Sequence, residues 1–241
     1  MRLKAAFIDI DNTLLDFDAY VRQTMEKGFA RFGLCPYAPW MYHVFTRENN
    51  ALWRRIEAGT LTFPELEKIR WNTVFAALGI QGDGPAFEAY FRKELHESAI
   101  PVPGAMDLLR ELRGKCILCA ASNGPEEQQL HRLRLSGMDD FFDDFFISQG
   151  LGASKPSKDF YARAFARLNA NRRLPILPEE TVMIGDSLTS DMAGGLGYGM
   201  AVCFFRRDSG QEVPACIPLA ADRLTDIPPM LENFFGFSPP A

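Results

Sequence analysis

An almost continuous apolar run close to the start of the chain limits the possible folds more than any other stretch. The run covers residues 5–10, is interrupted only by Asp9, and is followed by Asp11. Such a run is typical of a strand buried on both faces, as the strands of parallel sheets are. Side chains two positions apart point to the same side of a strand, so Asp9 and Asp11 should lie close together. A divalent cation is the simplest compensation for their repulsion, although Asp11 and Asn12 could also serve only as turn formers.

Two later apolar runs also lead into polar residues. The run over residues 116–121 is followed by Ser122, Asn123 and a glycine, and the run over residues 181–185 is followed by Asp186. Between them stands Lys155, just before an expected helix. In open α/β sheets, ligands bind where the strands end at their carboxyl edge. We therefore expect these polar residues to converge on one crevice.

The segment that follows the first run has a different pattern, with apolar residues at helical spacing. It predicts four helices, over residues 20–32, 41–57, 63–78 and 85–97. From residue 105 onward, expected strands and helices alternate, which predicts a parallel sheet flanked by helices. The predicted fold is therefore α/β, with a core of residues 1–17 and 99–241 and a helical domain of residues 18–98 inserted after the first strand. The tail from Pro228 onward is expected to be a surface segment.

In this order, the motifs resemble those of the haloacid dehalogenase (HAD) superfamily. The matching residues are Asp9 and Asp11 in the first motif, Ser122 in the second, Lys155 in the third, and Asp186 with Asp191 in the fourth. The resemblance covers the core on both sides of the helical insert. It implies a Rossmann-like core, and it implies that the insert is a cap domain that selects the substrate.

The resemblance also implies a phosphatase mechanism that passes through an aspartyl phosphate. Asp9 would be the nucleophile, and Asp11 the general acid and base, kept partly protonated by neighbouring carboxylates. Mg²⁺, with Mn²⁺ as an alternative, would be held by Asp9, the backbone carbonyl of Asp11, and Asp186. Asp191 and Thr13 would contact these groups and orient them, without being the main metal ligands. Asp191 could instead be only a carboxylate at a helix N-terminus.

Three further residues are expected to hold the phosphoryl group. They are the hydroxyl of Ser122, the backbone amide of Asn123 and the ammonium of Lys155. In a purely structural interpretation, Ser122 and Asn123 cap the next helix, and Lys155 is an exposed loop cation. Haloacid dehalogenases as a group lack an acid two residues after the nucleophile, so the presence of Asp11 favours phosphate chemistry.

The substrate is predicted from the insert. Residues 49–62, together with residues 11–17, are similar to the pyrimidine 5'-nucleotidase branch of the superfamily, which dephosphorylates nucleoside monophosphates. Asn49 and Trp53 are candidate substrate contacts, Trp53 by stacking on a base, although a buried tryptophan with a polar neighbour explains them equally well. The alternatives are a sugar-phosphate phosphatase, similar to N-acylneuraminate 9-phosphatases or phosphoglycolate phosphatases, then a phosphomutase, and then a binding module without activity.

Composition limits the partners. The net charge of −5 argues against nucleic-acid polymers and anionic membranes, but is compatible with a small phosphorylated metabolite. The N-terminus leads directly into the first strand, and no apolar run approaches the roughly 18 residues of a membrane span, so we expect a cytoplasmic protein. The five cysteines are odd in number, which does not favour a disulfide framework. A monomer and a homodimer both fit.

Overall fold

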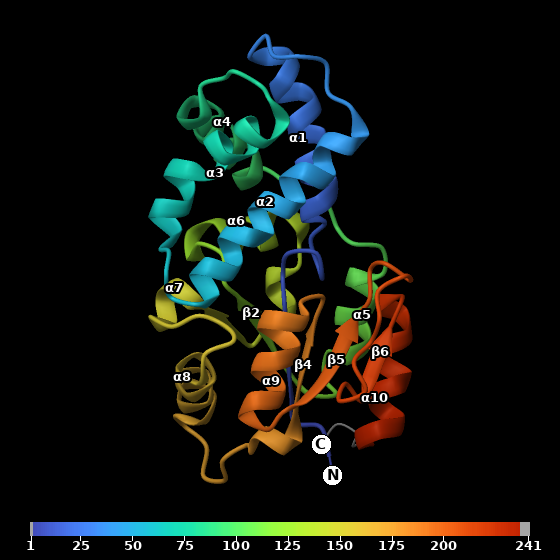
Figure 1. Ribbon diagram of the computed structural model, residues 1–241. Coiled ribbons are helices and arrows are strands. Elements are labelled where there is room, and N and C mark those ends of the chain that lie inside the picture. Colours follow the sequence, from blue (N-terminus) through green and yellow to red (C-terminus); the bar gives the residue numbers. More distant parts are fainter. Residues whose placement is uncertain (1, 237–241) are drawn as a thin grey trace. The chain divides into compact units, whose positions relative to one another are not determined.

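The computed structural model describes residues 2–236, which form two compact units (Figure 1). The first, an α/β unit, consists of the residues up to Asp16 and those from Ala99 onward. The second is a helical unit of residues Phe17–Ser98. In the described part of the chain, no helix combines the length and the apolar character needed to cross a membrane, and all five cysteines are free.

The α/β unit is built on a single parallel sheet, as the sequence predicts, and the sheet has six strands, of which the last, Leu219–Ala221, was not predicted. The strands are β1 (Ala5–Ile8), β2 (Ile117–Ser122), β3 (Asp144–Ile147), β4 (Thr181–Gly185), β5 (Ala201–Phe205) and β6 (Leu219–Ala221). Their order is β3-β2-β1-β4-β5-β6, and each neighbouring pair is parallel. The chain therefore builds outward from β1 in one direction and then in the other. The reversal places the topological switch point of the sheet between β1 and β4, and open α/β sheets bind ligands at the carboxyl ends of the strands at such a point.

Helices cover both faces of the sheet. They are α5 (Ala105–Leu112), α6 (Glu126–Ser136), α7 (Ser148–Leu151), α8 (Lys158–Asn169), α9 (Ala193–Tyr198) and α10 (Ile227–Phe235). The shorter turns are η1 (Asp139–Phe141), η2 (Pro178–Glu180), the π-helical η3 (Leu188–Met192) and η4 (Leu224–Asp226). Helices α5 and α10 lie on one side of the sheet, and α8 and α9 on the other (Figure 1).

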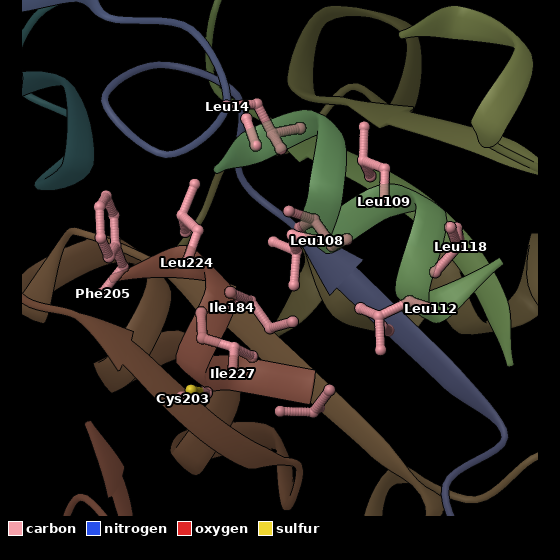
Figure 2. Packing of buried hydrophobic residues seen from close by; sticks show 14 of the residues in the cluster. Leu14, Leu108, Leu109, Leu112, Leu118, Ile184, Cys203, Phe205, Leu224 and Ile227 are labelled. Carbon is pink, nitrogen blue, oxygen red and sulfur yellow. The ribbon is translucent and has the colours of Figure 1, made fainter. Parts of the chain in front are cut away.

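Alternation along β1 assigns its side chains to two hydrophobic cores. Ala6 and Ile8 pack with α5, α6 and α10, whereas Ala5 and Phe7 pack with α8. Figure 2 shows the first core, where leucines of α5 meet Ile184 from β4 and Ile227 from α10. Because both faces are covered, β1 is apolar throughout, and the aspartates follow directly after its carboxyl end.

The prediction of a surface segment from Pro228 was wrong for residues up to Phe235. Those residues form most of α10, in which Pro228, Leu231 and Phe235 are buried. A proline in the first turn of a helix leaves the hydrogen-bond ladder intact, so the two prolines start this helix and do not break it. Residues 237–241 of the predicted tail lie outside the described part of the chain.

The helical unit contains the four predicted helices. They are α1 (Phe17–Arg31), α2 (Pro39–Glu57), α3 (Phe63–Leu78) and α4 (Gly84–His96). The start of α3 is fixed by Glu65, whose carboxylate accepts a hydrogen bond from the backbone amide of Thr62 at 2.8 Å. The interior is rich in aromatic rings, and the ring centroids of Trp71 and Phe87 are 4.2 Å apart.

Candidate active site

Asp9 lies directly after β1, at the carboxyl edge of the sheet. Its backbone amide donates to the carbonyl of Ile184 at 2.9 Å, which extends the pairing with β4 by one residue. Its side chain is almost buried, and Oδ1 accepts a hydrogen bond from Nζ of Lys155 at 2.7 Å. Burial raises the pKa of Asp9 to about 7 against the opposing effect of Lys155. A bound cation would favour the ionised carboxylate.

The Lys155 ammonium donates three hydrogen bonds, all to acceptors of the α/β unit. Its ammonium donates to Oδ1 of Asp9 at 2.7 Å, to Oδ1 of Asp191 at 2.6 Å and to the carbonyl of Ala121 at 2.7 Å. Burial disfavours the ammonium, but Asp191 and Asp9 outweigh this effect and raise the pKa of Lys155. Lys155 is thus a buried cation and not an exposed loop residue. A phosphoryl oxygen that binds Lys155 has to share or replace one of these three acceptors.

Three carboxylates come together beside Lys155. Ligand oxygens of Asp9, Asp186 and Asp191 all lie within 4.8 Å of one another. Asp191 is fully buried in η3, and its Oδ2 accepts from the backbone amide of Ser187 at 3.1 Å. A Cβ at position 185 would lie 2.2 Å from Oδ2 of Asp191, so the glycine there makes room for this carboxylate. An oxygen-only, acid-rich group of this kind fits Mg²⁺.

The second acid of the first motif, Asp11, has different neighbours from those expected. Arg132 donates to Oδ1 at 2.6 Å, and the side-chain amide of Gln129 donates to Oδ2 at 2.7 Å. The sequence argument placed carboxylates beside Asp11, whereas the side chains that contact it here are hydrogen-bond donors. The Asp11 side chain is 34% exposed, so one side of it faces outward.

Ser122 and Asn123, at the end of β2, do not cap the following helix, because α6 has Pro125 as its N-cap residue and no side-chain cap. The hydroxyl oxygen of Ser122 accepts from the backbone amide of Gly124 at 3.1 Å and from Gln129 at 2.7 Å. Asn123 exchanges two hydrogen bonds, each 2.8 Å long, with the backbone of Lys155. The side chain of Asn123 therefore fixes the loop that carries the lysine.

Hydrogen bonds from Arg207 hold the turn that follows Asp11. Asn12 has a left-handed backbone with φ of 61°, and Arg207 donates to its side chain at 2.7 Å and to Asp16 at 2.8 Å. Thr13 is fully buried, and within residues 2–236 its hydroxyl has no hydrogen-bond partner. Thr13 is thus a buried polar residue of this turn, and its supporting role beside the acids remains a prediction.

The two candidate substrate contacts lie in the helical unit, where both have protein neighbours. Asn49 is 4% exposed, and its Oδ1 lies 3.5 Å from Nη1 of Arg70. Trp53 is partly buried against a small apolar cluster, with its ring centroid 5.8 Å from that of Phe63. Their role toward a substrate remains a prediction.

Sequence reasoning missed three basic or amide side chains of the site. Gln129 and Arg132 are both buried, three residues apart on one face of α6, and Arg207 follows β5. The sequence does contain a signal for Gln129 and Arg132, because Leu133 follows on the same helix face and points into the core. Polar residues on the apolar face of a helix indicate a buried polar contact.

Comparison with known proteins gives consistent matches over most of the chain. The family profile of haloacid dehalogenase-like hydrolases matches residues 3–199. YfnB of Bacillus subtilis, which is named as a HAD hydrolase, is 32% identical over 217 residues, 90% of each chain. Its crystal structure, described as bound to magnesium and as revealing interdomain movement, has a TM-score of 0.83 and 31% identity, and the match covers 96% of this chain and 99% of that chain.

Two enzymes with named substrates are also similar to this chain. The pyrimidine 5'-nucleotidase PynA of Streptococcus pneumoniae is 31% identical over 206 residues, which are 85% of this chain and 84% of PynA. The glyceraldehyde 3-phosphate phosphatase of Pyrococcus furiosus is 27% identical over an alignment of 244 positions that covers 96% of this chain and 92% of that enzyme.

Proposed function

Because this chain belongs to the haloacid dehalogenase-like hydrolases, we propose that it hydrolyses a small phosphate monoester through an aspartyl phosphate on Asp9. The observation that carries the proposal is the position of Asp9. Its carboxylate is held at the carboxyl edge of β1 by Lys155 on Oδ1, and Oδ2 has no hydrogen-bond partner in the described part of the chain. A carboxylate fixed through one oxygen presents the other as a nucleophile.

The proposed reaction has two steps. In the first, Oδ2 of Asp9 forms a bond to phosphorus while the bond from phosphorus to the leaving oxygen breaks, and Asp11 gives its proton to that oxygen. In the second, a water molecule attacks the phosphorus of the aspartyl phosphate and Asp11 takes the proton back. The products are an alcohol and inorganic phosphate, and both aspartates return to their starting forms.

Charge on the transferred group is stabilised by fixed donors and by a cation. The Ser122 hydroxyl, the Asn123 backbone amide and the Lys155 ammonium would bind the phosphoryl oxygens. Asp9, Asp186 and the backbone carbonyl of Asp11 would hold Mg²⁺, which when bound neutralises negative charge on the phosphoryl group.

Among substrates, we favour a nucleoside 5'-monophosphate. The support is the similarity to PynA over 85% of the chain and the presence of Trp53, whose ring could stack on a base. A sugar phosphate is the second candidate, favoured by the similarity to a glyceraldehyde 3-phosphate phosphatase. A binding module without activity is disfavoured, because every acid of the proposed mechanism is present.

The test is phosphate release from a panel of nucleoside monophosphates and sugar phosphates, each with Mg²⁺ and with EDTA. We expect release that EDTA abolishes, fastest with pyrimidine nucleotides. The control variant is Asp140→Asn, which changes an exposed aspartate of the same unit and should leave turnover unchanged. Faster release from sugar phosphates would replace the nucleotide assignment, and EDTA-resistant release would reject the role of the cation.

A further inference from the structure

Helix α6 brings two buried polar side chains to the edge of the site. Gln129 is 0% exposed and Arg132 is 1% exposed, and both lie on the helix face that also places Leu133 in the core. A buried guanidinium and a buried amide are costly unless they have partners. Their partners are Asp11 and Ser122, two of the groups assigned to phosphoryl transfer.

The hydrogen bonds of this group fix which way the Gln129 amide points. Arg132 donates from Nη1 to Oε1 of Gln129 at 2.9 Å, and a guanidinium can only donate. The oxygen of the amide must therefore face Arg132, and the NH₂ group must face the site. That NH₂ group donates to the Ser122 hydroxyl and to Oδ2 of Asp11, each at 2.7 Å.

The direction of these bonds determines what Ser122 can do. Its hydroxyl oxygen accepts twice, from Gln129 and from the backbone amide of Gly124. A hydroxyl has two acceptor sites and one hydrogen, so the hydrogen is left to donate. The close approach needs a glycine, because a Cβ at position 124 would lie 2.7 Å from the Gln129 nitrogen.

Asp11 is held in the same way, through both of its oxygens. Arg132 binds Oδ1 and Gln129 binds Oδ2, so the carboxyl plane cannot rotate without breaking at least one hydrogen bond. Each carboxyl oxygen has a second acceptor site, and the side chain is 34% exposed. The outward side of the group is thus available to a leaving oxygen or a water molecule.

We propose that Gln129 and Arg132 are a positioning pair that holds the Asp11 carboxyl group and the Ser122 hydroxyl in the orientations that phosphoryl transfer needs. The inference rests on the proposed function, since it assigns Asp11 the proton transfer and Ser122 a phosphoryl oxygen. Neither Gln129 nor Arg132 is expected to touch the substrate.

The test uses the dependence of the rate on the leaving group, which a merely structural role would not change. The ratio of kcat/KM for an alkyl phosphate, glycerol 2-phosphate, to that for an aryl phosphate, p-nitrophenyl phosphate, is measured in the presence of Mg²⁺. The alkoxide needs a proton as it leaves, whereas the acidic phenol does not. General acid catalysis contributes roughly 10²–10⁴-fold, so we expect Arg132→Met to lower this ratio at least about 10-fold.

Matched variants on the same helix serve as controls. Arg134→Met makes the arginine change at an exposed position of α6, and Gln128→Met makes the glutamine change at the partly buried position next to Gln129. Both should leave the ratio unchanged. Gln129→Met should lower the ratio and also weaken inhibition by inorganic phosphate about 10-fold, because it removes the donor that directs the Ser122 hydroxyl. If Arg132→Met does not fold, Gln129→Met decides the question.

An equal fall with both substrates, or no fall, in the folded variants would overturn the positioning role. A wild-type protein that releases phosphate from neither substrate would instead reject the proposed function. The two failures are therefore distinguishable in one experiment.

Discussion

Each of the two units contains a buried cluster of charged residues, and the two clusters differ in charge balance. In the helical unit, Arg70 binds both carboxylate oxygens of Glu88, lies 4.7 Å from the centroid of the Phe91 ring, and reaches Asn49. One cation thus meets one anion, in a nearly solvent-free place.

In the α/β unit, a single ammonium is shared by two carboxylates. Lys155 binds Asp9 and Asp191, and Asp186 brings a third carboxylate into the same group. Buried charges are stable when they are paired, so the Arg70 cluster is complete as it stands, while the acid-rich cluster calls for an additional cation. The balance of charge, and not burial itself, therefore distinguishes a structural ion pair from a candidate catalytic site.

The largest effect is expected from removing the nucleophile. Asp9→Asn should lower kcat roughly 10⁴-fold or more, because an amide cannot form the phosphoryl bond. The fold should survive, since Lys155 keeps Asp191 as a partner. Steady-state phosphate release measures kcat, and circular dichroism measures whether the fold is retained. Turnover within 10-fold of wild type would contradict the mechanism.

In the helical unit, a comparable change should affect stability. Arg70→Met leaves Glu88 buried without its cation, and breaking such a pair costs about 3–5 kcal/mol of unfolding free energy. The double variant Arg70→Met/Glu88→Leu removes both charges and should recover most of that loss. Arg110→Met, which breaks an exposed pair with Asp107 in the α/β unit, should cost at most about 1 kcal/mol.

Urea unfolding measures the free energies of unfolding of these variants. If the double variant is no more stable than Arg70→Met, the balance of charge is not what stabilises this cluster.

A smaller effect is expected for the proposed metal ligand. Asp186→Asn should raise the Mg²⁺ concentration for half-maximal activity by about 10- to 100-fold, because it removes one negative ligand from the acid-rich cluster. The measurement is a Mg²⁺ titration of phosphate release, with Asp140→Asn as the control. An unchanged Mg²⁺ requirement would remove Asp186 from the ligand set.

The smallest effect concerns the candidate base contact. Trp53→Leu should raise KM for a pyrimidine nucleotide about 5-fold and leave KM for a sugar phosphate unchanged, since ring stacking contributes about 0.5–1.5 kcal/mol. Equal changes for both substrates would assign Trp53 to packing with Phe63 alone.

Much of the α/β unit could be predicted from the sequence. The parallel sheet and the family follow from local signals: apolar runs that end in Asp9, Ser122 and Asp186. The strand β6 and the helix α10 were missed, because three residues of strand and two early prolines give weak local signals.

Other features of the site depend on contacts between distant residues, which no local pattern reports. Arg132 is 121 residues from Asp11, and Lys155 is 146 residues from Asp9. The sequence therefore identified Asp11 but not the donors around it. Likewise, it singled out Asn49 as a candidate contact without showing that Arg70 reaches it.

The most direct test of the central claim is to trap the covalent intermediate. The protein is mixed with substrate labelled with ³²P and with Mg²⁺, quenched in acid within milliseconds, and digested for peptide mapping. We predict acid-stable label on the peptide that contains Asp9, lost on treatment with hydroxylamine and absent from Asp9→Asn. Full turnover without label on that peptide, or with label on another residue, would contradict the account.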